Sequence, residues 1–261
     1  MEVRADQSLA PDERRLAPTL FIAGDVHLGG THSDSGTAFP QWLDWLAIRP
    51  PARLVLLGDL FEWWIDGDEA VARHAVVLER LRLLAERGWR LDLVQGNREL
   101  VAGRRLEAAS GCRLHRRRLD IQLGPVRVRI VHGDRLCFDP GYRAYVAVVE
   151  SFPFAWFQRL HPIAVQESVA SWLRRRSAGR HRAPRPSSGR PRVFLDRRRI
   201  QAAARDSDVV VAGHIHQAWR RRIGGVDLIL VGDWPGDRGQ WIEGTADGRL
   251  VAVQRTFAAH D

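Results

Sequence analysis

The chain has 261 residues, enough for one full hydrophobic core or for one domain carrying an inserted subdomain. Hydrophobic residues make up 45% and charged residues 27%, as in ordinary globular proteins, and no apolar run is long enough to span a bilayer. The two cysteines, Cys112 and Cys137, form neither a disulfide framework nor a zinc-binding spacing. With a charged N-terminal region that lacks an apolar signal segment, these features predict a cytoplasmic protein.

The charge is strongly basic. The formal net charge is +9, and all 40 basic residues are Arg. A bias towards Arg codons explains the absence of Lys, but it does not explain the crowding of arginines between 174 and 205. A basic chain attracts phosphates, nucleic acid or anionic membrane surfaces, while a solvated face is the plainer interpretation of the same run.

Strands and helices alternate in the first half of the chain. Residues 1–18 are predicted to form a flexible leader. The elements that follow, assigned from apolar runs, helical spacing and the breaks at Pro50 and Gly88, are a strand at 19–24, a helix at 39–48, a strand at 54–57, a helix at 69–87, a strand at 91–95 and a short helix ending at 110. Such a series predicts right-handed crossovers and a mostly parallel sheet.

The composition changes after residue 139. Residues 142–176 are rich in aromatic and aliphatic side chains broken by Pro153 and Pro162, a pattern typical of two or three short amphipathic helices. The Arg-, Pro-, Ser- and Gly-rich segment 179–191 follows. We therefore expect residues 140–195 to be a helical cap inserted into an α/β core.

The predicted core consists of residues 19–139 and 196–257. A helix near 194–204 leads back to a strand at 209–212. The tail carries turn signals between short β-like runs and predicts an antiparallel meander.

Five apolar strands end on side chains that bind divalent metals. The run Leu54–Leu57 reads as a strand buried on both faces, and Gly58 then allows the sharp turn that presents Asp59. The other four strands run into Asp25-Val26-His27, Gly96-Asn97-Arg98-Glu99, His132-Gly133-Asp134 and Gly213-His214-Ile215-His216. Because open α/β sheets bind ligands beyond the carboxyl ends of their strands, we expect these endings to converge on one crevice.

The candidate ligands are too many for one tetrahedral ion and suit two ions that share a carboxylate. They are Asp25, His27, Asp59, Asn97, His132, His214 and His216. Asp59 is the natural bridge because no other ligand lies on its loop. An i, i+2 spacing on an extended segment points both side chains to one side, so that His214 and His216 could serve neighbouring ions.

The donor set also predicts the metal and its chemistry. Nitrogen and oxygen donors without thiolate favour Mn, Fe or Zn over Ca or Mg. Two divalent ions about 3.5–4 Å apart activate a water and neutralise phosphate oxygens, which favours an anionic substrate.

These five blocks, in this order, resemble the calcineurin-like metallophosphoesterases over nearly the whole chain. The resemblance implies an α/β fold, a four-layered α/β/β/α sandwich with the helical cap as an insertion. It implies one ion on Asp25, His27, Asp59 and His216. It implies a second ion on Asp59, Asn97, His132 and His214. We expect two divalent ions, manganese in the first place, with Fe or Zn as alternatives.

Departures from the common pattern indicate a branch of the family. Arg98 stands where most members have His, and Glu99 stands where the branch has Asp. The Gly-Asn-Arg-acid block, the run from His132 through Asp139 to Tyr142, and Gly232-Asp233-Trp234 resemble the branch that hydrolyses UDP-2,3-diacylglucosamine in lipid A synthesis. A guanidinium can contact two phosphate oxygens at once, which suits Arg98 to a diphosphate.

The branch resemblance implies a lipid-linked sugar nucleotide as substrate, with its acyl chains in the cap and the protein at the cytoplasmic face of the inner membrane. Asp59, Asn97, Arg98 and His132 would be catalytic. The implied substrate contacts are Asn97, Arg98, Asp139, Tyr142, Arg174, Ser177, Arg190 and His214. Here the cap carries Arg where the branch carries Lys.

Other interpretations stay open at this level. A phosphomonoesterase or phosphodiesterase of the same family, acting on protein, nucleotide or nucleic acid, would carry the same ligands, and the Arg content keeps a nuclease in view. A scaffold with decayed ligands is disfavoured because every ligand is present. Asp134 and Asp233 are interpreted as orienting or turn residues, and Trp63 and Trp64 as pocket or core residues. The apolar cap would equally suit a lid or a dimer interface.

Overall fold

The fold is described from a computed structural model, which covers residues 4–5, 16–29, 37–99, 102–137 and 195–257. The chain divides into two compact units, Met1–Leu136 with Arg197–Asp261, and Cys137–Asp196. The predictions for the cap at 140–195 lie outside the described residues, apart from residue 195. So do the predicted substrate contacts Asp139, Tyr142, Arg174, Ser177 and Arg190.

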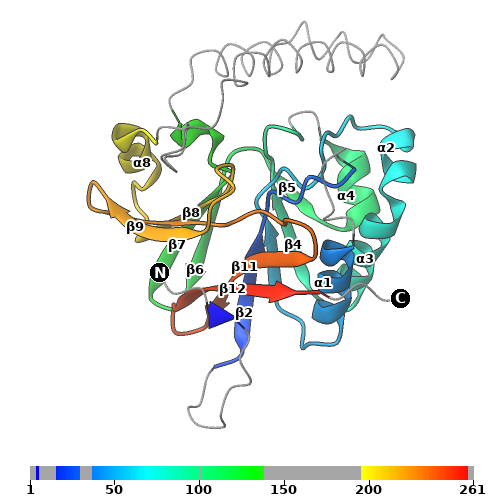
Figure 1. The fold of residues 1–261 in the computed structure, drawn as a ribbon, viewed down its shortest axis with the longest axis horizontal. Helices are drawn as coiled ribbons and strands as arrows, with labels where there is room; N and C mark the ends of the chain where they lie inside the picture. Colours follow the sequence, from blue (N-terminus) through cyan, green and yellow to red (C-terminus); the bar gives the residue numbers. More distant parts are fainter. Residues whose placement is uncertain (1–3, 6–15, 30–36, 100–101, 138–194, 258–261) are drawn as a thin grey trace, which may run out of the picture. The chain divides into compact units, whose positions relative to one another are not determined.

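The larger sheet has seven strands in the order β1-β12-β11-β2-β3-β4-β5 (Figure 1). They are β1 (Arg4–Ala5), β2 (Pro18–Ala23), β3 (Arg53–Leu56), β4 (Arg90–Val94), β5 (Arg113–His115), β11 (Arg238–Thr245) and β12 (Leu250–Thr256). Strands β2 to β5 run parallel, so their carboxyl ends meet at one edge, whereas β11 is antiparallel to both β2 and β12.

The smaller sheet has five strands in the order β6-β7-β8-β10-β9. They are β6 (Leu119–Leu123), β7 (Val126–Val131), β8 (Val209–Ala212), β9 (Trp219–Ile223) and β10 (Val226–Leu230). Strands β7, β8 and β10 are parallel, and β6 and β9 flank them antiparallel. Strands β7 and β8 therefore also end at a common edge.

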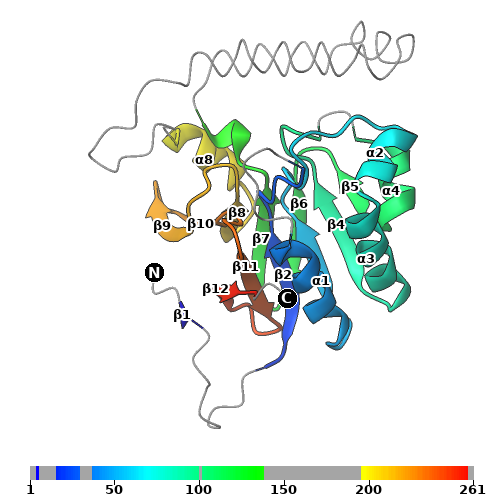
Figure 2. The same ribbon diagram turned by 45° about the vertical axis from the view of Figure 1, so that its right-hand side comes forward.

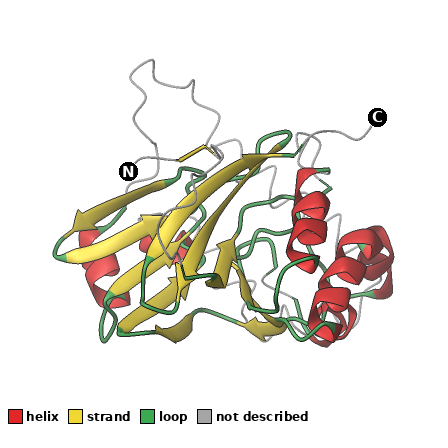
Figure 3. Ribbon diagram, turned by 90° about the horizontal axis from the view of Figure 1, so that it is seen from below, coloured by secondary structure: helices red, strands yellow, loops and turns green. Residues whose placement is uncertain are grey.

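Helices lie on the outer side of each sheet, as Figures 2 and 3 show. The described helices are α1 (Ala38–Ala47), α2 (Asp68–Arg73), α3 (Ala75–Glu86), α4 (Arg104–Ser110), α8 (Arg197–Ala203) and the short 3-10 helix η2 (Asp134–Leu136). No described helix is long and apolar enough to cross a membrane.

Successive side chains of a strand point to opposite faces of the sheet, so β2 and β3 contribute to two hydrophobic cores. Phe21 and Leu54 belong to the core under α1 and α3, while the adjacent Ile22 and Val55 belong to the core between the two sheets. Val128 and Ile130 of β7 line the same intersheet core from the other side.

Arg129 shows where α8 lies. It sits between two residues of the intersheet core, so its side chain leaves the opposite face of β7, where it pairs with Asp120. There Nη1 also donates to the carbonyls of Ala203 and Arg205 at the end of α8, at 2.8 and 2.6 Å. The α8 helix therefore covers the outer face of the smaller sheet.

The α/β class is confirmed, and all five strands that were predicted to end on metal-binding side chains are present. The mostly parallel sheet predicted from the first half of the chain is confirmed, because β2 to β5 are all parallel. Two local predictions were wrong. The tail divides, with β9 and β10 in one sheet and β11 and β12 in the other. Arg4 and Ala5 of the predicted leader pair with Val253 and Gln254 of β12, while 1–3 and 6–15 lie outside the described residues.

The helix predicted at 69–87 breaks at His74, which has φ −111° and ψ 18° between α2 and α3. The reason is tertiary: the imidazole is buried against Phe61, with ring centroids 4.4 Å apart, and near Trp64. Burial, together with the adjacent Arg73, lowers the pKa of His74 to about 4.

This burial predicts an acid-sensitive fold. Because the pKa of His74 lies near 4 in the folded state and near 6.5 when unfolded, its neutral form contributes stability above pH 6.5 that is lost as pH falls towards 4. We expect His74→Phe to reduce the loss of unfolding free energy between pH 7 and pH 4.5 by about 1 kcal/mol. Urea unfolding of both proteins at the two pH values measures this, and an unchanged pH dependence would contradict it.

Candidate metal centre

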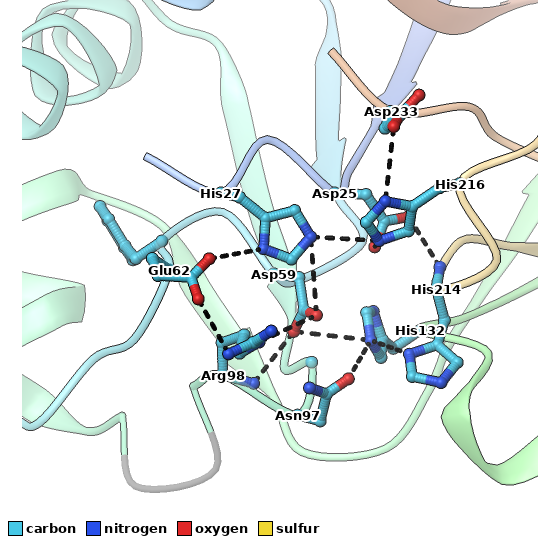
Figure 4. Close-up of polar contacts among 12 residues, drawn as sticks. Asp25, His27, Asp59, Glu62, Asn97, Arg98, His132, His214, His216 and Asp233 are labelled. Atoms are coloured by element: carbon cyan, nitrogen blue, oxygen red, sulfur yellow. Dashed lines mark hydrogen bonds and ion pairs between the residues drawn. The ribbon is translucent and has the colours of Figure 1, made fainter. Parts of the chain in front are cut away.

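The seven predicted ligands come together beyond the ends of five strands (Figure 4). Asp25 and His27 follow β2, Asp59 follows β3 and Asn97 follows β4. His132 follows β7, and His214 and His216 follow β8. The site therefore lies where the common edges of the two sheets meet.

One donor group consists of Asp25, His27 and His216, with one ligand atom from each lying within 4.8 Å of the others. The Nε2 atoms of the two histidines are 3.2 Å apart, and His216 Nε2 is 3.8 Å from Asp25 Oδ1. Asp25 Oδ1 is buried and has no hydrogen-bond partner among the described residues. A buried carboxylate oxygen without a partner is costly unless a cation satisfies it.

A second donor group consists of Asp59, His132 and His214. His132 Nε2 lies 3.2 Å from His214 Nδ1, 3.5 Å from Asp59 Oδ1 and 3.0 Å from Asn97 Oδ1. The other oxygen of Asp59, Oδ2, lies 4.0 Å from His27 Nε2 in the first group. Asp59 thus faces both groups, as a bridging carboxylate would.

The donors fit divalent metal ions. Each group combines imidazole nitrogen with carboxylate oxygen and contains no sulfur, a set suited to ions such as Mn, Fe or Zn. Pairs of imidazole nitrogens face each other at 3.2 Å in both groups, an arrangement that a shared cation would stabilise.

Burial and neighbouring charges shift the pKa values of the site residues. Burial raises the pKa of Asp25, whereas for Asp59 the effect of burial is outweighed by His132, His27 and Arg98, which lower its pKa. Burial alone would lower the pKa of His132, but Asp59 and Asp25 raise it to about 9. Divalent cations would supply the positive charge that these carboxylates require and leave the imidazoles neutral as ligands.

Five of the ligands adopt a left-handed backbone. The φ angles are 53° at Asp25, 55° at His27, 47° at Asp59, 70° at His214 and 56° at His216. The extended geometry assumed for the i, i+2 pairs is therefore wrong, although His214 and His216 do belong to different donor groups. A left-handed non-glycine residue costs about 1–2 kcal/mol, so other contacts must hold these loops.

Hydrogen bonds between loops provide those contacts. The backbone N–H groups of Asp25 and His27 donate to the carbonyls of Gly58 and Asp59 at 3.1 and 2.9 Å. The N–H of His214 donates to Asp25 Oδ2 at 2.7 Å. Each ligand loop is thus fixed by its neighbour.

Glu99 has a structural role that the sequence analysis missed. Its buried carboxylate accepts the backbone N–H groups of Asp59, Phe61 and Gly96 at 2.8, 3.0 and 3.3 Å. Burial and the charge of Asp59 raise the pKa of Glu99 to about 7. An acidic residue immediately after a ligand turn was the available signal, because a buried carboxylate there can accept several loop N–H groups.

Arg98 lies at the site as predicted. Its backbone N–H donates to Asp59 Oδ1 at 2.9 Å, and its Nε lies 3.8 Å from Asp59 Oδ2. Asp233 faces His216 Nδ1 at 3.4 Å, which agrees with an orienting role. Glu62 contacts His27 and Arg98, and the sequence analysis did not predict this. Trp64 is a core residue, buried and donating to Asp66 Oδ1 at 3.2 Å.

Solved structures overlap with the chain only loosely. A phosphoesterase, YfcE, from E. coli is 16% identical, with a TM-score of 0.42 over 92% of this chain and 99% of that one. Vps29 with zinc from Entamoeba histolytica is 14% identical, with a TM-score of 0.39 over 92% of this chain and 99% of that one. No protein-family model matches the chain.

Sequence relatives are more informative. A UDP-2,3-diacylglucosamine hydrolase of Sodalis glossinidius is 34% identical over 206 residues, which is 76% of this chain and 82% of the relative. Those of Pseudomonas putida and a Shewanella species are 30% and 31% identical and cover 85% and 88% of this chain, and 92% and 95% of their own. The chain belongs to the UDP-2,3-diacylglucosamine hydrolase family. The predicted resemblance is confirmed, and the two donor groups agree with membership of a family of metal-dependent hydrolases.

The glycine before Asp59 gives a test of how the site is built. Gly58 has φ 79°, and a Cβ there would lie 2.2 Å from Gly96 N, because the two ligand loops touch through their backbones. Gly225 has φ 90° with nothing within 4 Å of such a Cβ. We expect Gly225→Ala to cost about 1 kcal/mol of stability, and Gly58→Ala to cost clearly more and to weaken metal binding.

Thermal unfolding and manganese titration of both variants measure these effects. Equal losses of stability, with metal binding intact in Gly58→Ala, would show that the contact between the loops is not needed.

Proposed function

We propose that this protein hydrolyses the diphosphate of UDP-2,3-diacylglucosamine, releasing UMP and 2,3-diacylglucosamine 1-phosphate in lipid A biosynthesis. The proposal rests on the position of Asp59, whose carboxylate faces both donor groups and also Arg98. Family membership supports the substrate.

The proposed ligands are those of the two donor groups with Asn97 added. Asp25, His27, Asp59 and His216 would hold one divalent ion, and Asp59, Asn97, His132 and His214 the other, with manganese proposed and Fe or Zn as alternatives. Bound metal would supply positive charge that polarises a water and neutralises phosphate oxygens.

Arg98 is the proposed contact to the diphosphate. Its Nε is buried and has no hydrogen-bond partner among the described residues, while the side chain keeps 28% of its surface exposed. A guanidinium held beside the bridging carboxylate can donate to two phosphate oxygens of an anionic substrate. Asn97, through its amide, and His132 complete the proposed catalytic set with Asp59. His214, Asp139, Tyr142, Arg174, Ser177 and Arg190 remain proposed substrate contacts.

Hydrolysis assays on different substrates test the proposal and separate it from the alternatives. With manganese, we expect UMP release from the diacylated sugar nucleotide and much less from the same nucleotide without acyl chains. His132→Ala should lower turnover by more than about 100-fold, since loss of even an outer partner of a metal ligand costs 10–100-fold.

Equal rates on both nucleotides would remove acyl recognition from the proposal. Preferred cleavage of single-stranded DNA or of a phosphomonoester would favour another phosphoesterase activity, and full activity of His132→Ala would contradict the metal assignment.

We further propose that the protein works in the cytoplasm, bound peripherally to the inner membrane. Exposed arginines on adjoining elements support this: Arg197 and Arg198 lie on α8, and Arg221 and Arg222 on β9. Gln201 of α8 donates to the carbonyl of Gly224 in the β9–β10 turn at 2.9 Å, so the two elements are in contact. A basic surface of this kind attracts anionic lipid.

Vesicle sedimentation tests the membrane proposal. Each Arg near an anionic surface is worth about 1 kcal/mol, so Arg221→Ser with Arg222→Ser should weaken binding to phosphatidylglycerol vesicles about 30-fold. The matched control is Arg113→Ser with Arg116→Ser, which removes the same charge from β5 and the residue just after it. Equal losses in the two double variants, or none, would contradict a role for this surface.

A further inference from the structure

Glu62 lies between a candidate metal ligand and Arg98. It stands three residues after Asp59, and its backbone N–H donates to the carbonyl of Leu28 at 3.0 Å, beside the loop that carries His27. Its two oxygens face different partners: Oε2 is 3.4 Å from His27 Nδ1, and Oε1 accepts from Arg98 Nη1 at 3.1 Å (Figure 4).

The orientation of His27 makes Glu62 its natural support. His27 Nε2 faces His216 Nε2 and Asp59 Oδ2, so this nitrogen points into the donor groups. Its Nδ1 is buried without a hydrogen-bond partner among the described residues, and the Glu62 carboxylate is the acceptor that faces it. The other nitrogen of a metal-binding histidine is almost always held by a carboxylate, a backbone carbonyl or a water.

Glu62 also holds the guanidinium of Arg98. Arg98 Nε lies 3.8 Å from Asp59 Oδ2, so this cation lies close enough to compete with metal ions for the bridging carboxylate. The bond from Nη1 to Glu62 gives the guanidinium a second anionic partner and limits its approach to Asp59. One carboxylate thereby affects both the ligand and the proposed phosphate contact.

We propose that Glu62 is a positioning residue that couples the metal centre to recognition of the diphosphate. It orients His27 towards its ion and holds Arg98 where a phosphate can reach it. The role towards Arg98 rests on the proposed function, whereas the role towards His27 concerns metal binding alone.

Metal binding without substrate tests the first role. Manganese titration of dialysed protein can be followed by the paramagnetic resonance signal of free Mn²⁺. We expect Glu62→Ala to lower the affinity for one of the two ions about 10–100-fold. Glu62→Gln keeps one acceptor oxygen and should give an intermediate loss. Glu69→Gln is the matched control, because Glu69 also pairs with an arginine, Arg73, at 3.0 Å on α2.

Hydrolysis at saturating manganese tests the second role. Glu62→Ala should raise the KM for the sugar nucleotide, and adding it to Arg98→Ala should change KM little further, because both substitutions remove the same contact. Asp233→Asn provides a second comparison, since Asp233 faces only the histidine side of the site in Figure 4. It should weaken metal binding without raising KM at saturating manganese.

The outcomes separate the two roles from each other and from the proposed function. Manganese affinities of both Glu62 variants within twofold of the unmodified protein would overturn the role towards His27. Additive effects of Glu62→Ala and Arg98→Ala on KM would overturn the coupling. An unmodified protein that binds two Mn²⁺ but releases no UMP would refute the proposed function and the coupling that rests on it, and the titration would still decide the role towards His27.

Discussion

The metal centre depends on a left-handed backbone at five of its seven candidate ligands. This conformation turns the chain sharply at the end of each strand, so that the side chains face one another instead of continuing along the sheet. It is unfavourable for Asp and His, and hydrogen bonds between neighbouring loops offset the cost. Strain concentrated at these positions agrees with a functional site.

Close backbone contact makes those hydrogen bonds possible. Gly58 lies against Gly96 with no room for a side chain, and the Glu99 carboxylate accepts N–H groups from the loops of both β3 and β4. Packing between the two sheets brings β7 and β8 alongside, so that His132 and His214 reach Asp59. The geometry of the site is therefore a consequence of how the sheets pack.

Carboxylates outside the donor groups contact the ligand histidines. Asp233 and Glu62 stand behind the two histidines of one group, whereas His132 in the other group has its Nδ1 against the carbonyl of Leu57 at 2.7 Å. Glu62 and Asp59 together also flank Arg98. Metal binding and the proposed contact to phosphate thus share their supporting residues.

The sequence by itself determined the α/β class, the five strand endings and the identity of the candidate ligands, because buried strands and metal-binding side chains leave local patterns that survive without three-dimensional information. Tertiary structure decided which ligands group together, the left-handed turns at Asp25 and His27, the break at His74 and the division of β9 to β12 between two sheets. It also decided the contacts of Glu62 and Glu99. These features depend on tertiary partners, such as Arg98 for Glu62 and Asp59 for Glu99, and no local pattern encodes such a contact.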